Sequence, residues 1–273
     1  MFHSAVQAAY DVKYEIYDLG IAKIIVTGGN SESCREALRL SRLYPDYLFF
    51  TAGLNSEKNI IFLFNSLMQE IQECIHIMPK NFRLMYSRKL NILPKSRSAW
   101  LSVKLACRIK KPLFVHERDA HEQLKEVLVK YKADLPDIVI HCFTGTADEA
   151  KTYLDLGFYI GLTGFLWKDR TEDGVQYALR NGLFPMERLM VETDAPFMFP
   201  NIQAKKLPED IKDRLSDHAR QYLLKYCSFH RNEPCSLPAV TELVAAFMNV
   251  PVGELAFATT RNAVQVFGLT TRL

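Results

Sequence analysis

The sequence lacks three features that would point to a secreted, membrane-bound or zinc-stapled protein. No apolar run reaches the roughly 18 residues that span a bilayer, and the first residues, MFHS, open no apolar signal region. None of the six cysteines stands at CxxC spacing, which argues against a disulfide framework and a structural zinc. These absences predict a reducing compartment, the cytoplasm or nucleus, and no membrane partner.

The chain also has little excess of charge of either sign. The formal net charge is +3, which is too small to indicate a nucleic-acid partner by itself. Hydrophobic residues make up 48% and charged residues 24% of the chain, as in a soluble globular protein. A length of 273 residues suits one large α/β barrel or two small domains, and we expect a single domain over 1–273.

Short apolar segments alternate with segments of helical character. Six are predicted as strands, at residues 22–27, 47–52, 112–116, 137–140, 158–162 and 189–191. Helices are predicted between and around them, at 5–18, 33–44, 57–73, 100–110, 120–131, 146–157 and 174–180, and again through the last 75 residues. Ser33 with Glu36, and Thr146 with Glu149, are spaced as capping boxes. This order predicts parallel strands joined by crossover helices, an α/β fold of the TIM-type (β/α) barrel class. A closed barrel needs eight strands, so the barrel is expected to be incomplete.

The segment at 74–98 fits neither pattern. It holds six Lys or Arg, no Asp or Glu, and two prolines. It is interpreted either as a surface loop or as a basic arm for nucleic acid. About 25 residues without structure inside a compact domain are unusual, so the segment is treated as atypical.

Three predicted strands end in residues that suit metal chemistry. The strand at 112–116 ends at His116, the strand at 137–140 runs into His141, and the strand at 189–191 precedes Asp194. The carboxyl ends of parallel barrel strands open on one face, so these side chains can converge. Imidazole and carboxylate together suit Zn, Mn or Mg. We therefore predict His116, His141 and Asp194 as metal ligands or catalytic residues.

Their neighbours have more than one interpretation. Glu192 lies two positions before Asp194 on the same side of the strand, and it could orient a ligand histidine. Arg118 could bind a phosphate through its planar fork or form a surface ion pair. Asp119 stands where a helix N-cap is expected. Cys142 has no independent base in the sequence, so a nucleophilic role is not expected.

The segment Arg231-Asn232-Glu233-Pro234 is a compact polar motif. Pro234 can begin a helix at its first position, with Asn232 as the cap. Glu233 could reach the mouth of the site or belong to the helix start.

Together these stretches resemble the TatD-type metal-dependent deoxyribonucleases of the amidohydrolase-like barrels. The matching segments are PLFVHERDAHE (112–122), IVIHCFTGT (138–146), YIGLTG (159–164), LMVETDAPF (189–197), RNEP (231–234) and TRNAVQVFGL (260–269). IVTGGN (25–30) and FFTAG (49–53) are similar to the family's second and third strands. The resemblance implies an eight-stranded barrel that hydrolyses DNA phosphodiester bonds with one or more divalent metals, Mg, Mn or Zn. It also implies that His116, His141 and Asp194 match metal or catalytic positions.

The chain departs from the family pattern at three places. The first strand with its metal-binding His or Asp motif is missing, and the third strand ends in Gly53-Leu54-Asn55-Ser56 instead of Gly-x-His-Pro. The fourth-strand motif, whose Glu bridges the metals, has no match in residues 71–100. Its place falls in the atypical segment, and our hypothesis is an altered exon or a change of reading frame. These losses predict weak or absent nuclease activity.

The expected function is a DNA hydrolase, with DNA as substrate and no obligate protein partner. Two alternatives stay open. One is a small-molecule amidohydrolase on the same fold, and the other is a non-catalytic DNA-binding or scaffold protein derived from the family.

Overall fold

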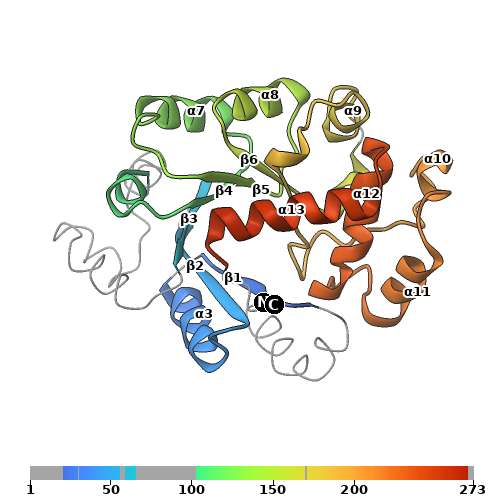
Figure 1. Cartoon of the computed structure of the whole chain (residues 1–273), viewed down its shortest axis with the longest axis horizontal. Helices are drawn as coiled ribbons and strands as arrows, with labels where there is room; N and C mark the ends of the chain where they lie inside the picture. The colour runs from blue at the N-terminus through green and yellow to red at the C-terminus, as the bar shows by residue number, and fades with distance from the viewer. Residues whose placement is uncertain (1–20, 30, 56–58, 66–102, 170, 270–273) are drawn as a thin grey trace. The chain divides into compact units, whose positions relative to one another are not determined.

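The computed structural model describes residues 21–29, 31–55, 59–65, 103–169 and 171–269 (Figure 1). The chain folds as two compact units. One is Ala22–Val139, and the other is Ile140–Leu273 together with Met1–Ile21. The predicted helix at 5–18 and the atypical segment at 74–98 lie outside the described residues. The prediction of a single domain stays a prediction.

The unit Ala22–Val139 is built on strands that pair in chain order. β1 (Ile24–Gly28) pairs in parallel with β2 (Leu48–Asn55). The helix α3 (Ser31–Leu43) joins them and packs on both (Figure 1). β3 (Asn59–Asn65) then pairs antiparallel with β2 and with β4 (Leu113–Glu117). This unit is therefore not purely parallel.

Two expectations for this unit were wrong. Residues 59–65 were predicted as helix, but NIIFLFN forms β3. A continuous apolar run rich in Ile and Phe suits a strand with both faces covered, and short runs of this kind are ambiguous by period alone. Ser33 is not a helix cap, because α3 begins two residues earlier. Its hydroxyl instead accepts a hydrogen bond from the Gly29 amide at 3.0 Å.

A further helix covers residues 103–109, and the unit then continues from β4 into α7 (His121–Lys130). The chain crosses into the second unit within β5 (Ile138–His141), all four residues of which are buried. The predicted strands and helices of this stretch are confirmed. Their ends shift by one or two residues, as helix and strand ends commonly do.

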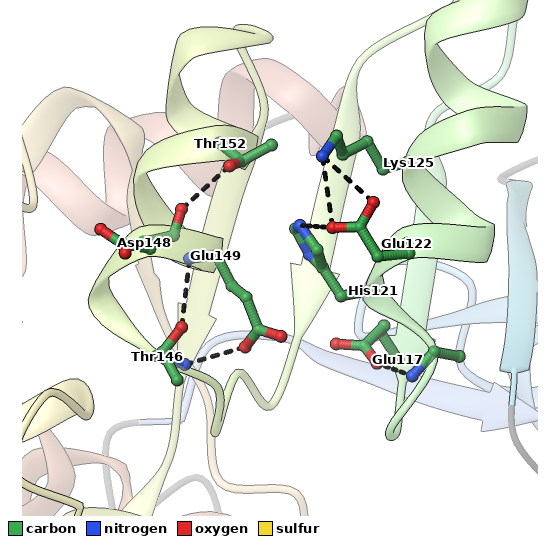
Figure 2. Close-up of polar contacts among 9 residues, drawn as sticks. Glu117, His121, Glu122, Lys125, Thr146, Asp148, Glu149 and Thr152 are labelled. Atoms are coloured by element: carbon green, nitrogen blue, oxygen red, sulfur yellow. Dashed lines mark hydrogen bonds and ion pairs between the residues drawn. The ribbon is translucent and has the colours of Figure 1, made fainter.

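The unit that starts at Ile140 begins with alternating elements. After β5 come α8 (Ala147–Asp155), β6 (Tyr159–Leu162), η1 (Gly164–Lys168), α9 (Val175–Arg180), η2 (Met186–Arg188) and β7 (Leu189–Val191). β6 and β7 pair in parallel. The predicted capping box at α8 is confirmed (Figure 2). The Thr146 hydroxyl accepts from the Glu149 amide at 3.3 Å, and the Glu149 carboxylate accepts from the Thr146 amide at 2.9 Å.

The rest of this unit is helical, as predicted. Its helices are α10 (Glu209–Lys212), α11 (Asp217–Tyr226), η3 (Pro234–Ser236), α12 (Leu237–Met248) and α13 (Val252–Phe267). α12 contacts α13, and α13 packs against β7 (Figure 1). The buried Asn262 side chain of α13 donates to the Met186 and Leu189 carbonyls, both at 2.8 Å. The last long helix therefore anchors the start of β7.

Within the described ranges, no helix on its own has the length and apolarity to cross a membrane. The segments Pro234–Met248 and Val252–Phe267 satisfy that test only as a pair, and they are bent by 113° relative to one another.

Candidate active site

His141 is the last residue of β5, and its side chain is held between two carboxylates. It is 8% exposed. Its Nδ1 contacts the Glu192 carboxylate in a short hydrogen bond. On the other side, Nε2 lies 3.4 Å from Asp194 Oδ1. All three residues belong to the same compact unit, so a buried strand end, a histidine and two acids form one group.

The Glu192 carboxylate uses both oxygens. One contacts His141, and Oε1 accepts a hydrogen bond from the Cys142 amide at 2.7 Å. The backbone of Glu192 is itself fixed, because its amide donates to the Leu162 carbonyl at 2.9 Å. This arrangement requires a glycine at position 161 in β6, because a residue with a Cβ would meet the Glu192 carboxylate. A Cβ at that position would lie 2.1 Å from Glu192 Oε1.

Asp194 sits in a turn that directly follows β7. Its φ is 49°, a left-handed conformation that Asp tolerates better than most residues. The turn is stabilised by hydrogen bonds from Asn232, a buried residue that is 1% exposed. The Asn232 side-chain amide donates to the Thr193 carbonyl at 2.9 Å, and its backbone amide donates to the Pro196 carbonyl at 2.9 Å. Asn232 is therefore a positioning residue for the Asp194 turn.

The expectation that Asn232 caps the helix after it was wrong. The residue before η3 is Glu233, and Pro234 takes the first helical position as predicted. The RNEP motif itself was the sequence signal for this role, but Thr193, the partner of the Asn232 side chain, lies 39 residues away in sequence. Local patterns do not report such distant partners.

The carboxylates decide the charge of His141. Burial alone would lower its pKa, but Glu192 and Asp194 outweigh burial and raise it to about 10. The imidazole is thus a cation at neutral pH while no metal competes for it. Burial raises the pKa of the neighbouring Cys142 thiol, and the two carboxylates raise it further. A protonated thiol is a poor nucleophile, consistent with the expectation from sequence.

The polar residues after β4 are arranged differently. Glu117 Oε1 accepts from the Ala120 amide at 2.6 Å, at the start of α7 (Figure 2). Asp119 is exposed with φ of 52°, and the residue before α7 is Ala120. The expected N-cap role of Asp119 was therefore wrong. Arg118 is exposed, and His116 is partly buried near the end of β4.

His116 belongs to the unit Ala22–Val139, whereas His141 and Asp194 belong to the other unit. The convergence of His116 with them stays a prediction.

Glu233 forms an ion pair with Arg231, with Nε and Oε1 2.6 Å apart. Burial raises the pKa of Glu233, and Arg231 opposes that rise. Its expected place at the mouth of the site stays a prediction.

Comparison with known proteins identifies the group to which this arrangement belongs. The sequence profile of the family described as "TatD related DNase" matches residues 101–268. The chain belongs to this family. The TatD protein of Edwardsiella piscicida, described as a 3'-5' ssDNA/RNA exonuclease, is 32% identical over 262 residues. That match covers 92% of this chain and 89% of the relative. The Shigella flexneri protein of the same description is 29% identical. That match covers 95% of this chain and 92% of the relative.

Solved TatD structures share the fold. The TatD homologue YJJV of Escherichia coli matches with a TM-score of 0.62 at 20% identity, covering 92% of this chain and 88% of the other. A TatD family hydrolase of Entamoeba histolytica matches with a TM-score of 0.63 at 19% identity. The match covers 93% of this chain and 87% of the other. These matches confirm the predicted α/β barrel-type fold.

TatD proteins are metal-dependent, and the metal-ligand role of His141 and Asp194 stays a prediction. Two ligands of one tetrahedral zinc, each at about 2.0–2.2 Å, stand about 3.4 Å apart. His141 Nε2 and Asp194 Oδ1 have that separation, 3.4 Å. A carboxylate on the far nitrogen, here Glu192, is typical of metal-binding histidines. The described residues form no group of three or more His, Cys, Asp or Glu side chains that could hold an ion.

Proposed function

We propose that this TatD family member is a metal-dependent hydrolase that acts on phosphodiester bonds of DNA. The observation that carries the proposal is the partly buried group in which Glu192 orients the buried His141 and His141 faces Asp194. Family membership and the exonuclease description of the 32% identical relative give the substrate class. The cytoplasm or nucleus remains the expected location.

The divalent ion, Mg, Mn or Zn, would be held by His141 Nε2 and Asp194, with His116 as the proposed third ligand. When bound, such an ion lowers the pKa of a water molecule and polarises a phosphoryl oxygen. Three protein ligands are enough for a catalytic zinc.

The remaining residues have positioning roles in this proposal. The Glu192 carboxylate accepts a hydrogen bond from the Nδ1–H group of His141, which fixes the tautomer and directs Nε2 towards Asp194. Asn232 holds the turn from which Asp194 projects. Arg118, exposed after β4, is proposed to bind a substrate phosphate, and Glu233 is proposed to lie at the site entrance.

The absent bridging-Glu motif leads us to expect weak activity. A two-metal site generally requires a carboxylate between its ions, and none of the family's fourth-strand residues is recognisable in the sequence. We expect slow metal-dependent cleavage compared with a relative that has the complete motif, and a complete loss of cleavage would favour the non-catalytic alternative.

The test is cleavage of end-labelled single- and double-stranded DNA with Mg, Mn or Zn, beside a family member whose sequence has the complete fourth-strand motif. Metal-dependent cleavage that His141→Ala abolishes supports the hydrolase. Activity equal to the complete relative contradicts the expected impairment, and metal binding without cleavage contradicts the hydrolase itself.

A non-catalytic DNA-binding protein is the second candidate, favoured by the missing motifs. Salt-dependent DNA binding without bound metal and without cleavage would support it. Comparison of the reading frames of the encoding gene tests the altered-exon hypothesis. An in-frame relative that also lacks the fourth-strand motif would count against that hypothesis.

A further inference from the structure

Two cysteines that have no role in the proposed chemistry stand at the ends of a short hairpin. Residues 227–235, here named the Cys hairpin, join α11 to η3. Ser228 and Arg231 close it through two backbone hydrogen bonds of 2.9 and 3.0 Å. At its ends, the Sγ atoms of Cys227 and Cys235 lie 3.9 Å apart. A modest side-chain movement would bring the two sulfurs to bonding distance, about 2.05 Å.

The two thiols have unequal surroundings. Cys235 is 5% exposed, and its hydrogen bond to Cys227 together with burial raises its pKa. Cys227 is partly exposed, and the hydrogen bond from Cys235 lowers its pKa against the effect of burial. One thiol that is accessible and acidic, beside a buried second thiol, is the usual arrangement of an attacking and a resolving cysteine.

The Cys hairpin also carries the support of the Asp194 turn. Asn232, within the hairpin, donates to the carbonyls of Thr193 and Pro196. The exposed Phe229 ring packs edge-on against Trp167, with ring centroids 6.1 Å apart. A bond that closes the hairpin ends would therefore restrict the segment that fixes the Asp194 backbone.

We propose that Cys227 and Cys235 form a reversible disulfide that clamps the Cys hairpin and, through Asn232, the Asp194 turn. The oxidant is a small-molecule disulfide. The Cys227 thiolate attacks one of its sulfurs, which forms a mixed disulfide and releases one thiolate. Cys235 then loses its proton and attacks Cys227 Sγ, which releases the second thiolate. The oxidant gains two electrons and becomes two thiols. Formation of the bond does not depend on the proposed nuclease function.

The first test is peptide mapping of the full chain after incubation with oxidised glutathione. Trypsin cleaves after Arg231, between the two cysteines, so the disulfide would join peptide 226–231 to peptide 232–261. We expect this linked pair, lighter by two hydrogen atoms than the sum of its parts, and its disappearance on reduction. Cys107→Ser, a change outside the hairpin, should leave its yield unchanged. Separate glutathione adducts on Cys227 and Cys235 with no linked pair would overturn the proposal.

The second test measures the clamp without relying on activity. The Phe197 amide donates to the Asp194 carbonyl at 2.8 Å, so its hydrogen exchange reports on the turn. Oxidation should slow that exchange at least about threefold, because closing the hairpin suppresses local opening. In the Cys227→Ser and Cys235→Ser variants, the same oxidant should leave the hydrogen exchange of the Phe197 amide unchanged. A linked pair without slower exchange would show that the disulfide does not act on the Asp194 turn.

Discussion

The polar residues after β4 and those after β5 and β7 begin from similar sequence signals but differ in their contacts. At the end of β4, Glu117 accepts from the Ala120 amide, and Arg118 and Asp119 are exposed. At the ends of β5 and β7, His141 and Glu192 contact one another in a partly buried group that also includes Asp194. A strand-end histidine therefore indicates where chemistry can occur, and the carboxylate contacts of His141 show that its orientation is fixed.

The largest expected effect is that of Glu192→Gln. The variant loses the carboxylate that orients His141 and accepts from the Cys142 amide, so metal affinity should fall about 10- to 100-fold. Zinc titration calorimetry measures it. Glu117→Gln, the equivalent change after β4, should leave metal affinity nearly unchanged. Equal losses in both variants would remove the difference between the two regions.

Gly161→Ala should displace the Glu192 carboxylate and so disturb its contact with His141. The new Cβ would stand 2.1 Å from Glu192 Oε1, so the carboxylate must move, at a cost of about 1–3 kcal/mol in unfolding free energy. Metal affinity should fall as well, and combination with Glu192→Gln should add little because the two changes act on one contact. Gly253→Ala is the control, since no atom lies within 4 Å of its Cβ. An unaltered metal affinity in Gly161→Ala would be incompatible with this account.

Asn232→Ala should lower the unfolding free energy by about 1–3 kcal/mol, because a buried side chain is removed and the partly buried Thr193 carbonyl loses its donor. Urea unfolding gives the value. Asn181→Ala removes a hydrogen bond of similar length, 2.8 Å to the Tyr177 carbonyl, but at an exposed helix end, so its cost should be smaller. The prediction fails if the exposed and the buried asparagine are equally costly to replace.

The last expected effect is one of pH on the metal-free protein. Because its pKa of about 10 lies above the ordinary 6.5, His141 stabilises the fold fully below pH 6.5. That stabilisation is lost as pH rises through about 10. Glu192→Gln removes the principal charge that raises this pKa, so unfolding free energy should decline less over the same range. Parallel pH profiles for wild type and variant would contradict the assigned ion pair.

Much of the fold followed from local patterns in the sequence. β5, β6 and β7 were predictable because buried apolar runs end in polar bursts or glycine turns, and α8 because Thr146 and Glu149 are spaced as a capping box. β3 was missed because NIIFLFN has no period that separates strand from buried helix.

The site was predictable only in outline. Glu192 lies against His141, as its side of the strand indicated, although the role of His141 as a ligand stays a prediction. The role of Asn232 was missed because its partners are set by tertiary packing, 39 residues away. The need for glycine at 161 was also invisible, since it arises from a carboxylate on the neighbouring strand.

The two hydrogen bonds from Asn262 have a consequence for the order of folding during synthesis. They join the start of β7 to a helix that is translated more than 70 residues later, since Asn262 is separated from Met186 by 76 positions and from Leu189 by 73. The strand that leads to Asp194 can therefore gain this anchor only after residue 262 has left the ribosome.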